Sequence, residues 1–155
     1  MKDLREAIMG HPFFDDMKTA DLDIVAHGAK EAKFKGGELL FREGEPADHL
    51  FLIRKGKVAL EAHEPADGTA LVQELGDGDV LGWSWLFPPY VWHFQARALE
   101  PTEAVMIDGG HLLTAAERDP KFGYNLMKRV SRVVIQRLQA TRKQLLAQQL
   151  NAALG

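Results

Sequence analysis

Cysteine is absent from the chain, and so is any long apolar run. Without cysteine the protein has no disulfide framework, no thiol nucleophile, no zinc finger and no cysteine-ligated iron–sulfur cluster. No segment reaches the roughly 18 consecutive apolar residues of a membrane-spanning helix. The opening MKDLRE also lacks the apolar core of a signal peptide. These absences predict a cytoplasmic protein that does not associate with a membrane.

Signals of catalysis are scarce as well. Serine occurs only at Ser84 and Ser131, neither of them in a G-x-S-x-G motif, and no phosphate-binding P-loop occurs. A cupin-like metalloenzyme usually has a His-x-His pair, and no two histidines lie at a spacing typical of a metal site. The histidines are His11, His27, His49, His63, His93 and His111. We therefore expect no catalytic site, no metal site and no enzyme, with a metal-dependent cupin-like enzyme as the weaker alternative.

The composition is that of an ordinary folded protein. Of the 155 residues, 46% are hydrophobic and 26% are charged, a balance that separates folded chains from disordered ones. A chain of this length buries roughly 70% of its unfolded surface, so it needs no disulfide or structural metal. We expect one domain over residues 1–155. That length does not accommodate both a sensor and an effector domain.

The formal net charge of −3 hides an uneven distribution. Residues 121–150 contain seven basic and no acidic side chains, whereas the first 120 residues have a net charge of −10. Two interpretations are open. The basic segment packs against its own acidic body, or it faces an anionic ligand or nucleic acid.

Short β-rich runs alternate with glycine turns between residues 31 and 108. The runs lie at 39–41, 50–53, 58–60, 70–72, 94–99 and 104–107. Such spacing predicts a mainly β fold with flanking helices, an antiparallel β-roll or jelly-roll barrel. Residues 1–30 are expected to form two short helices with Asp3 and Thr19 as N-caps. Gly109 and Gly110 are expected to end the last strand, ahead of helices over 110–150.

The last helix has a clear start and two apolar stripes. Asp119 is its expected N-cap, with Pro120 at the first helical position. One stripe, Leu126, Val130 and Val133, is expected to face the barrel. The other follows the heptad steps of a coiled coil and predicts a homodimer, although a single wide face against one core is an alternative. The expected dimer interface is Met127, Val134, Leu138, Thr141 and Leu145.

Aromatic residues concentrate between residues 83 and 94. This segment holds all three tryptophans, Trp83, Trp85 and Trp92, together with Phe87, Tyr90 and Phe94. Such a cluster forms either the wall of a pocket for a flat or apolar ligand or a plug at one end of the barrel. Both interpretations fit the sequence.

Residues 36–60 resemble the first half of a cyclic-nucleotide-binding domain. The GDVLG segment and the following LF resemble the entry to that family's phosphate-binding cassette. Residues 137–141 are similar to part of the dimerising helix of the Crp/Fnr regulators. The matching positions in the first half are Gly37, Leu40, Gly44, Glu45, Ala47, Leu50, Phe51, Ile53, Gly56 and Val58.

The resemblance implies a ligand site whose sugar-phosphate end is altered. In the family a Gly-Glu pair holds the ribose 2′-hydroxyl, but Gly82 is followed here by Trp83. The family's phosphate-binding arginine falls on Trp92 or His93, depending on the direction of counting. Loss of such a charge-assisted contact weakens the binding free energy of the phosphate by about 1.5–3 kcal/mol.

The resemblance of the C-terminal helix implies that the base-binding end of the ligand site is retained. Arg137, Thr141 and Arg142 fall where family members contact the purine, although Thr141 also fits a packing role in the dimer. The candidate ligand-binding residues are Gly82, Trp83, Ser84, Trp85, Trp92, His93, Phe94, Gln95, Arg137, Thr141 and Arg142.

The resemblance therefore implies a ligand-sensing regulatory module. No cofactor is assigned. The expected ligand is nucleotide-like or a planar small molecule, not cAMP bound in the family's usual way, and the output passes to an unknown protein partner. An alternative is a Crp/Fnr-type transcription regulator that acts with DNA or a DNA-binding partner. Because the chain ends at Gly155, we expect no helix-turn-helix domain and no nucleic-acid binding by this chain alone. Haem is a minor alternative, with His93 beside the aromatic cluster.

Overall fold

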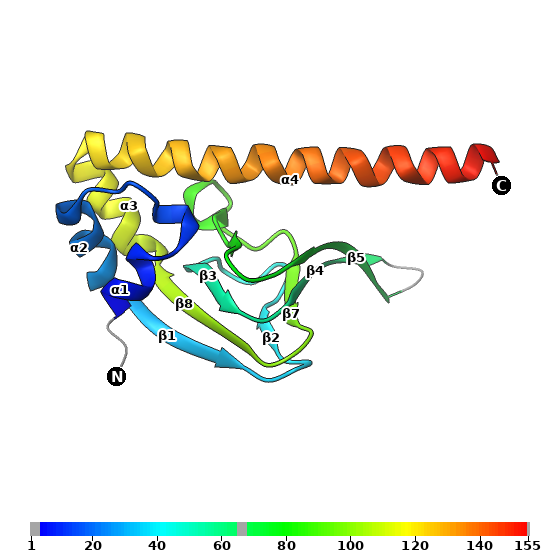
Figure 1. The fold of residues 1–155 in the computed structure, drawn as a ribbon, viewed down its shortest axis with the longest axis horizontal. Helices are drawn as coiled ribbons and strands as arrows, with labels where there is room; N and C mark the ends of the chain where they lie inside the picture. Colours follow the sequence, from blue (N-terminus) through cyan, green and yellow to red (C-terminus); the bar gives the residue numbers. More distant parts are fainter. Residues whose placement is uncertain (1–3, 65–67, 155) are drawn as a thin grey trace.

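Two four-stranded antiparallel sheets form a β-roll flanked by helices (Figure 1). The computed structural model describes residues 4–64 and 68–154. The strand orders are β1-β8-β3-β6 and β2-β7-β4-β5. The strands are β1 (Ala29–Phe34), β2 (Leu39–Phe41), β3 (His49–Lys55), β4 (Val58–Glu64), β5 (Gly68–Leu75), β6 (Val80–Leu81), β7 (Gln95–Ala98) and β8 (Thr102–Asp108). The expected β-roll is confirmed, and it begins at Ala29 rather than at residue 31.

Helices precede and follow the roll. They are α1 (Leu4–Met9), the short 3-10 helix η1 (Pro12–Phe14), α2 (Thr19–His27), the 3-10 helix η2 (Ser84–Leu86), α3 (Gly109–Arg118) and α4 (Pro120–Leu154). With 35 residues, α4 is about 50 Å long. It runs along the whole length of the molecule in Figure 1, while α1, α2 and α3 gather near its N-terminal end.

The helix starts agree only in part with the sequence. Asp119 caps α4 as expected, because its Oδ1 accepts the Lys121 N–H at 3.1 Å. Thr19 is not an N-cap: the first helical bond of α2 runs from Leu22 N–H to Lys18 O, so Lys18 is the cap. Asp3 lies outside the described residues.

The glycines at 109 and 110 begin α3 instead of ending β8. Asp108 decides this, because its Oδ1 accepts the His111 N–H at 2.8 Å and caps the helix. Gly109 also needs to lack a side chain, since a Cβ there would lie 2.5 Å from the Trp85 ring.

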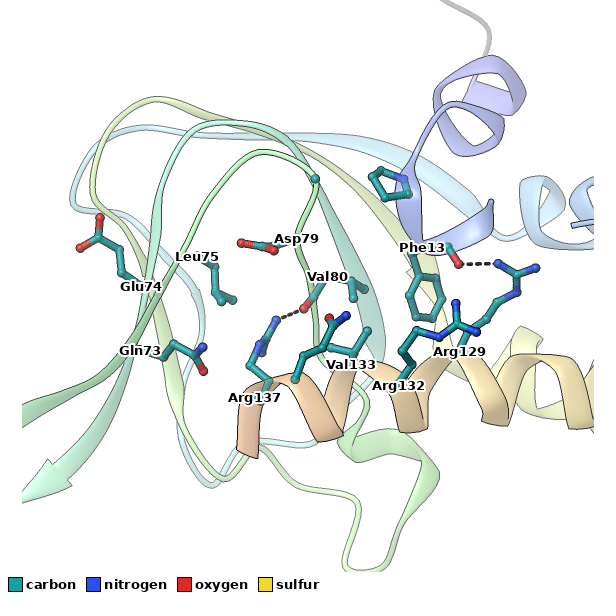
Figure 2. A pocket seen from close by; sticks show the side chains of 13 residues that line it. Phe13, Gln73, Glu74, Leu75, Asp79, Val80, Arg129, Arg132, Val133 and Arg137 are labelled. Carbon is teal, nitrogen blue, oxygen red and sulfur yellow. Dashed lines mark hydrogen bonds between the residues drawn. The ribbon is translucent and has the colours of Figure 1, made fainter. Parts of the chain in front are cut away.

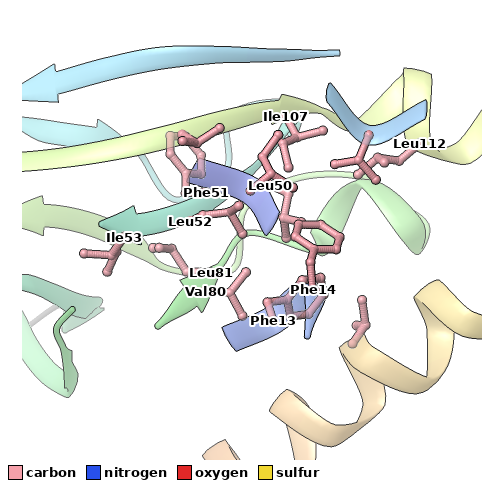
Figure 3. Packing of buried hydrophobic residues seen from close by; sticks show 14 of the residues in the cluster. Phe13, Phe14, Leu50, Phe51, Leu52, Ile53, Val80, Leu81, Ile107 and Leu112 are labelled. Carbon is pink, nitrogen blue, oxygen red and sulfur yellow. The ribbon is translucent and has the colours of Figure 1, made fainter. Parts of the chain in front are cut away.

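One hydrophobic core joins the roll to the helices (Figure 3). Four successive residues of β3, from Leu50 to Ile53, are fully buried, and Phe14 and Leu112 reach the same core from η1 and α3. Leu126 and Val130 of α4 are buried and Val133 is half-buried, which confirms that this stripe faces the roll.

A buried histidine fixes η1 to the roll. The His11 Nδ1 accepts the Phe13 N–H at 3.2 Å, so in the neutral ring the Nε2–H donates to Ile53 O at 3.3 Å. Burial lowers the pKa of His11, partly offset by the hydrogen bond to Ile53. The ring is therefore neutral at pH 7, with Nδ1 capping η1 and Nε2 holding it against β3.

Candidate functional site

A small cavity of about 110 Å³ lies between the β6–η2 segment, the start of β7 and α4. Ten residues line it, most of them apolar or aromatic. They are Phe41, Leu60, Leu81, Gly82, Trp83, Ser84, Trp92, His93, Phe94 and Arg137.

The turn that carries this site requires glycine at position 82. Gly82 has a φ of +91°, and a Cβ there would lie 2.7 Å from His49 O and 3.1 Å from the Trp92 ring. Both the left-handed backbone and the close approach exclude a side chain. The Trp85 Nε1–H donates to Gly82 O at 2.6 Å and fixes the following 3-10 turn.

Two stacked rings fill the inner side of the cavity. Trp92 is only 3% exposed. Its ring lies 3.9 Å from that of Phe41 with an interplanar angle of 15°, and Phe51 packs 5.6 Å from Phe41. This arrangement buries a large apolar area and leaves little free volume.

Arg137 supplies the positive charge of the cavity from α4. Its Nη2–H donates to Val80 O (Figure 2), and its guanidinium carbon lies 5.2 Å from the Trp83 ring centroid, a cation–π contact. Burial lowers the pKa of Arg137 to about 10, and the charge of Asp79 opposes this shift. The group therefore stays charged at neutral pH. Among the described side chains no carboxylate forms an ion pair with it.

The structure brings many of the sequence-predicted residues together around this cavity. Those that line it are Gly82, Trp83, Ser84, Trp92, His93, Phe94 and Arg137. Trp85 instead packs against Gly109 at the start of α3. Gln95 donates to Glu61 Oε1 at 2.7 Å on the neighbouring strand. Thr141 and Arg142 are exposed on α4 and do not line the cavity.

Three lining residues were not among the sequence candidates: Phe41, Leu60 and Leu81. Phe41 and Leu60 belong to predicted β-rich runs and Leu81 to the GDVLG segment, and their hydrophobicity predicts burial. Which buried residues border the cavity depends on how the two sheets pack, so the sequence pattern does not single them out.

Residues 31–119 match the family model described as "Cyclic nucleotide-binding domain". The chain belongs to this family. The resemblance seen in the glycine pattern of residues 36–60 is therefore confirmed, and the 110 Å³ cavity lies in the segment that resembles the family's phosphate-binding cassette.

Several known proteins are similar to this one over most of the chain. A CRP-like cAMP-activated global transcriptional regulator of Mycobacterium tuberculosis is 30% identical over 85% of this chain, which spans 57% of that regulator's length. A Geobacter metallireducens protein named for cyclic nucleotide binding is 30% identical, with a TM-score of 0.78 over 86% of this chain and 97% of its own. The sensor domain of the transcriptional regulator DNR of Pseudomonas aeruginosa shares the fold, with 15% identity and a TM-score of 0.71 over 89% of this chain and 95% of that domain.

In the described part of the chain, no group of three or more His, Cys, Asp or Glu side chains is placed to hold a metal ion. Within residues 4–64 and 68–154 no helix combines the length and the apolar character needed to cross a membrane.

Proposed function

We propose that this member of the cyclic nucleotide-binding family is a non-enzymatic sensor of a small planar ligand, and that it does not bind cAMP in the family's usual way. The observation that carries the proposal is the contact between Arg137 and Trp83 across the cavity. Trp83 stands where the family has the glutamate for the ribose hydroxyl. The flat guanidinium group of Arg137 therefore lies against the flat ring of Trp83. A planar ligand can stack on either of these two groups.

The size and polarity of the cavity support the same proposal. About 110 Å³ is well below the roughly 300–1,000 Å³ of pockets that enclose drug-sized ligands. It suits a single ring system better than a whole nucleotide. On the strand side, His93 and Trp92 occupy the region of the family's phosphate-binding arginine, and neither is a permanent cation.

Calorimetric titration with cAMP and cGMP tests the proposal. We expect no binding of either nucleotide tighter than about 10 μM. The double variant Trp83→Glu/His93→Arg restores a carboxylate and a guanidinium at the altered positions, so we expect it to bind cAMP more tightly than the unmodified protein. Binding below about 10 μM by the unmodified protein would contradict the proposal.

We further propose that α4 pairs with α4 of a second copy. Its outer stripe exposes Met127, Val134, Leu138 and Leu145, and residues 141–154 are all exposed. A heptad stripe of this kind is stable in water when a second helix covers it.

Sedimentation velocity measures this association. We expect the protein to have twice its chain mass of 17.3 kDa. Leu138 is 67% exposed, so Leu138→Lys leaves the fold intact but places a charge in the seam, and we expect it to be monomeric. The neighbouring Gln139→Lys adds the same charge outside the seam and is expected to remain dimeric. A monomeric unmodified protein contradicts the pairing.

Transcription regulation is the second candidate function. It is supported by the 30% identity with the M. tuberculosis regulator and by the basic character of residues 121–150. Electrophoretic mobility shifts at low and high salt distinguish direct regulation from nonspecific DNA binding. Sequence-selective binding that resists salt favours direct regulation, whereas nonspecific phosphate contacts weaken steeply with salt.

A further inference from the structure

A second and larger cavity, of about 350 Å³, lies between η1, the corner where β5 turns into β6, and α4 (Figure 2). Its volume falls in the range of pockets for small organic molecules. Arg129 and Arg132 line one end and Gln73 and Glu74 the other, with Arg137 and the carboxylate Asp79 between them. Arg137 also lines the smaller cavity, so its side chain lies between the two spaces.

Among the described residues, the buried cation Arg129 donates hydrogen bonds only to neutral groups. It is 9% exposed. Its Nη1–H donates to Phe13 O at 2.7 Å and its Nε–H to Asn125 Oδ1 at 2.7 Å. Burial lowers the pKa of Arg129, and the charge of Arg132 adds to this effect, opposed by the more distant carboxylates of Asp15, Asp16 and Asp21.

Arg132 lies one turn further along the same face of α4 and lines the same cavity. In the part of the chain that the structure describes, neither Arg129 nor Arg132 has a carboxylate within ion-pair distance, and the Arg132 side chain makes no hydrogen bond. Two like charges three residues apart on a helix destabilise each other. An anion between them would remove this repulsion.

The far end of the cavity has the opposite chemistry. Glu74 and Gln73 lie across the cavity from Arg129 and Arg132 (Figure 2). The side chains of Glu74 and Gln73 form no hydrogen bond with any other described residue. A carboxylate and an amide left free in this way accept hydrogen bonds from hydroxyl groups.

We propose that this cavity binds a phosphate monoester with a hydroxyl-bearing body, such as a sugar phosphate. The phosphate lies between Arg129 and Arg132, whose guanidinium groups donate hydrogen bonds to its oxygens. The hydroxyl groups of the body face Glu74 and Gln73. The bound molecule connects η1, the roll and α4, and this site is separate from the aromatic cavity proposed above.

Calorimetry with ribose 5-phosphate, at constant ionic strength, tests the site on the full chain. We expect saturable binding of one molecule per chain, weaker binding of inorganic phosphate and no binding of ribose. Arg132 is exposed and makes no bond to another described residue, so Arg132→Gln preserves the fold, and we expect it to weaken binding at least about tenfold. Arg142→Gln removes the same charge from an exposed position outside the cavity and is expected to bind as the unmodified protein does.

Three results would overturn the proposal. The first is the absence of saturable binding up to about 5 mM ribose 5-phosphate. Two charge-assisted contacts provide a higher affinity than such a result would allow. The second is equal weakening by Arg132→Gln and Arg142→Gln, with duplex DNA bound instead, because a general basic surface for nucleic acid would then explain the arginines. The third is inorganic phosphate binding as tightly as ribose 5-phosphate, because the Glu74 end would then contribute nothing.

Discussion

Replacing Trp92 with alanine is expected to lower the free energy of unfolding by about 3–5 kcal/mol. The indole is 3% exposed and stacks on Phe41 at 3.9 Å, with Phe51 packed 6.3 Å away. Truncation removes this apolar contact area and leaves a cavity that joins the existing space of about 110 Å³. Because Gly82 holds its backbone against the indole, the turn cannot fully close the gap.

Urea denaturation followed by circular dichroism measures this loss. The control is Phe94→Ala, which truncates a ring that also lines the cavity but is 39% exposed, and we expect it to cost no more than about 1 kcal/mol. An apolar cavity of the right shape binds a small aromatic molecule, so added indole is expected to raise the stability of Trp92→Ala and not that of Phe94→Ala. Equal losses in the two variants would contradict the stacked arrangement.

The second large effect is expected from Gly56→Ala. Gly56 has a φ of +130°, where an L side chain is strained. A Cβ at this position would lie 2.4 Å from Thr102 Oγ1 and 2.8 Å from the Thr102 Cα, which is backbone and cannot rotate away. Backbone strain and overpacking each cost about 1–3 kcal/mol, so we expect a loss of at least about 2 kcal/mol.

Gly37→Ala is the matched control for this substitution. Gly37 also has a positive φ, +91°, but a Cβ at this position would have no neighbouring atom within 4 Å. The variant therefore carries the backbone strain, about 1–2 kcal/mol, without the contact. The difference between the two variants in thermal unfolding measures the close approach to Thr102. A Gly37→Ala variant that is destabilised as much as Gly56→Ala would show that the contact contributes nothing.

Much of the fold follows from local patterns in the chain. Gly37, Gly44, Gly56 and Gly82 all have positive φ values, as turn glycines between β-rich runs should. The run Leu39–Phe41 is β2 with the same bounds. These features depend on the neighbours of each residue in sequence, and the sequence therefore predicts them well.

The site was less predictable, as its three tryptophans illustrate. They are alike in sequence, yet Trp92 is buried against Phe41, Trp83 contacts Arg137, and Trp85 packs against Gly109. These rings meet partners from other elements, some of them over 50 positions away along the chain. No periodicity in the segment 83–94 indicates which ring takes which partner.

The family, the β-roll and the long helix with two apolar stripes could all be inferred from the amino-acid order, because glycine spacing and helical periodicity are local properties of the chain. Which residues of the roll lie against the charged side chains of α4 could not, because that depends on tertiary packing. The packing brings Arg137 between Val80 and Trp83. It also leaves Arg129 and Arg132 facing a second cavity, and neither arginine forms an ion pair with a described carboxylate. Which charges are neutralised depends on distances between segments far apart in the chain, and these distances exist only after the helix has packed against the roll.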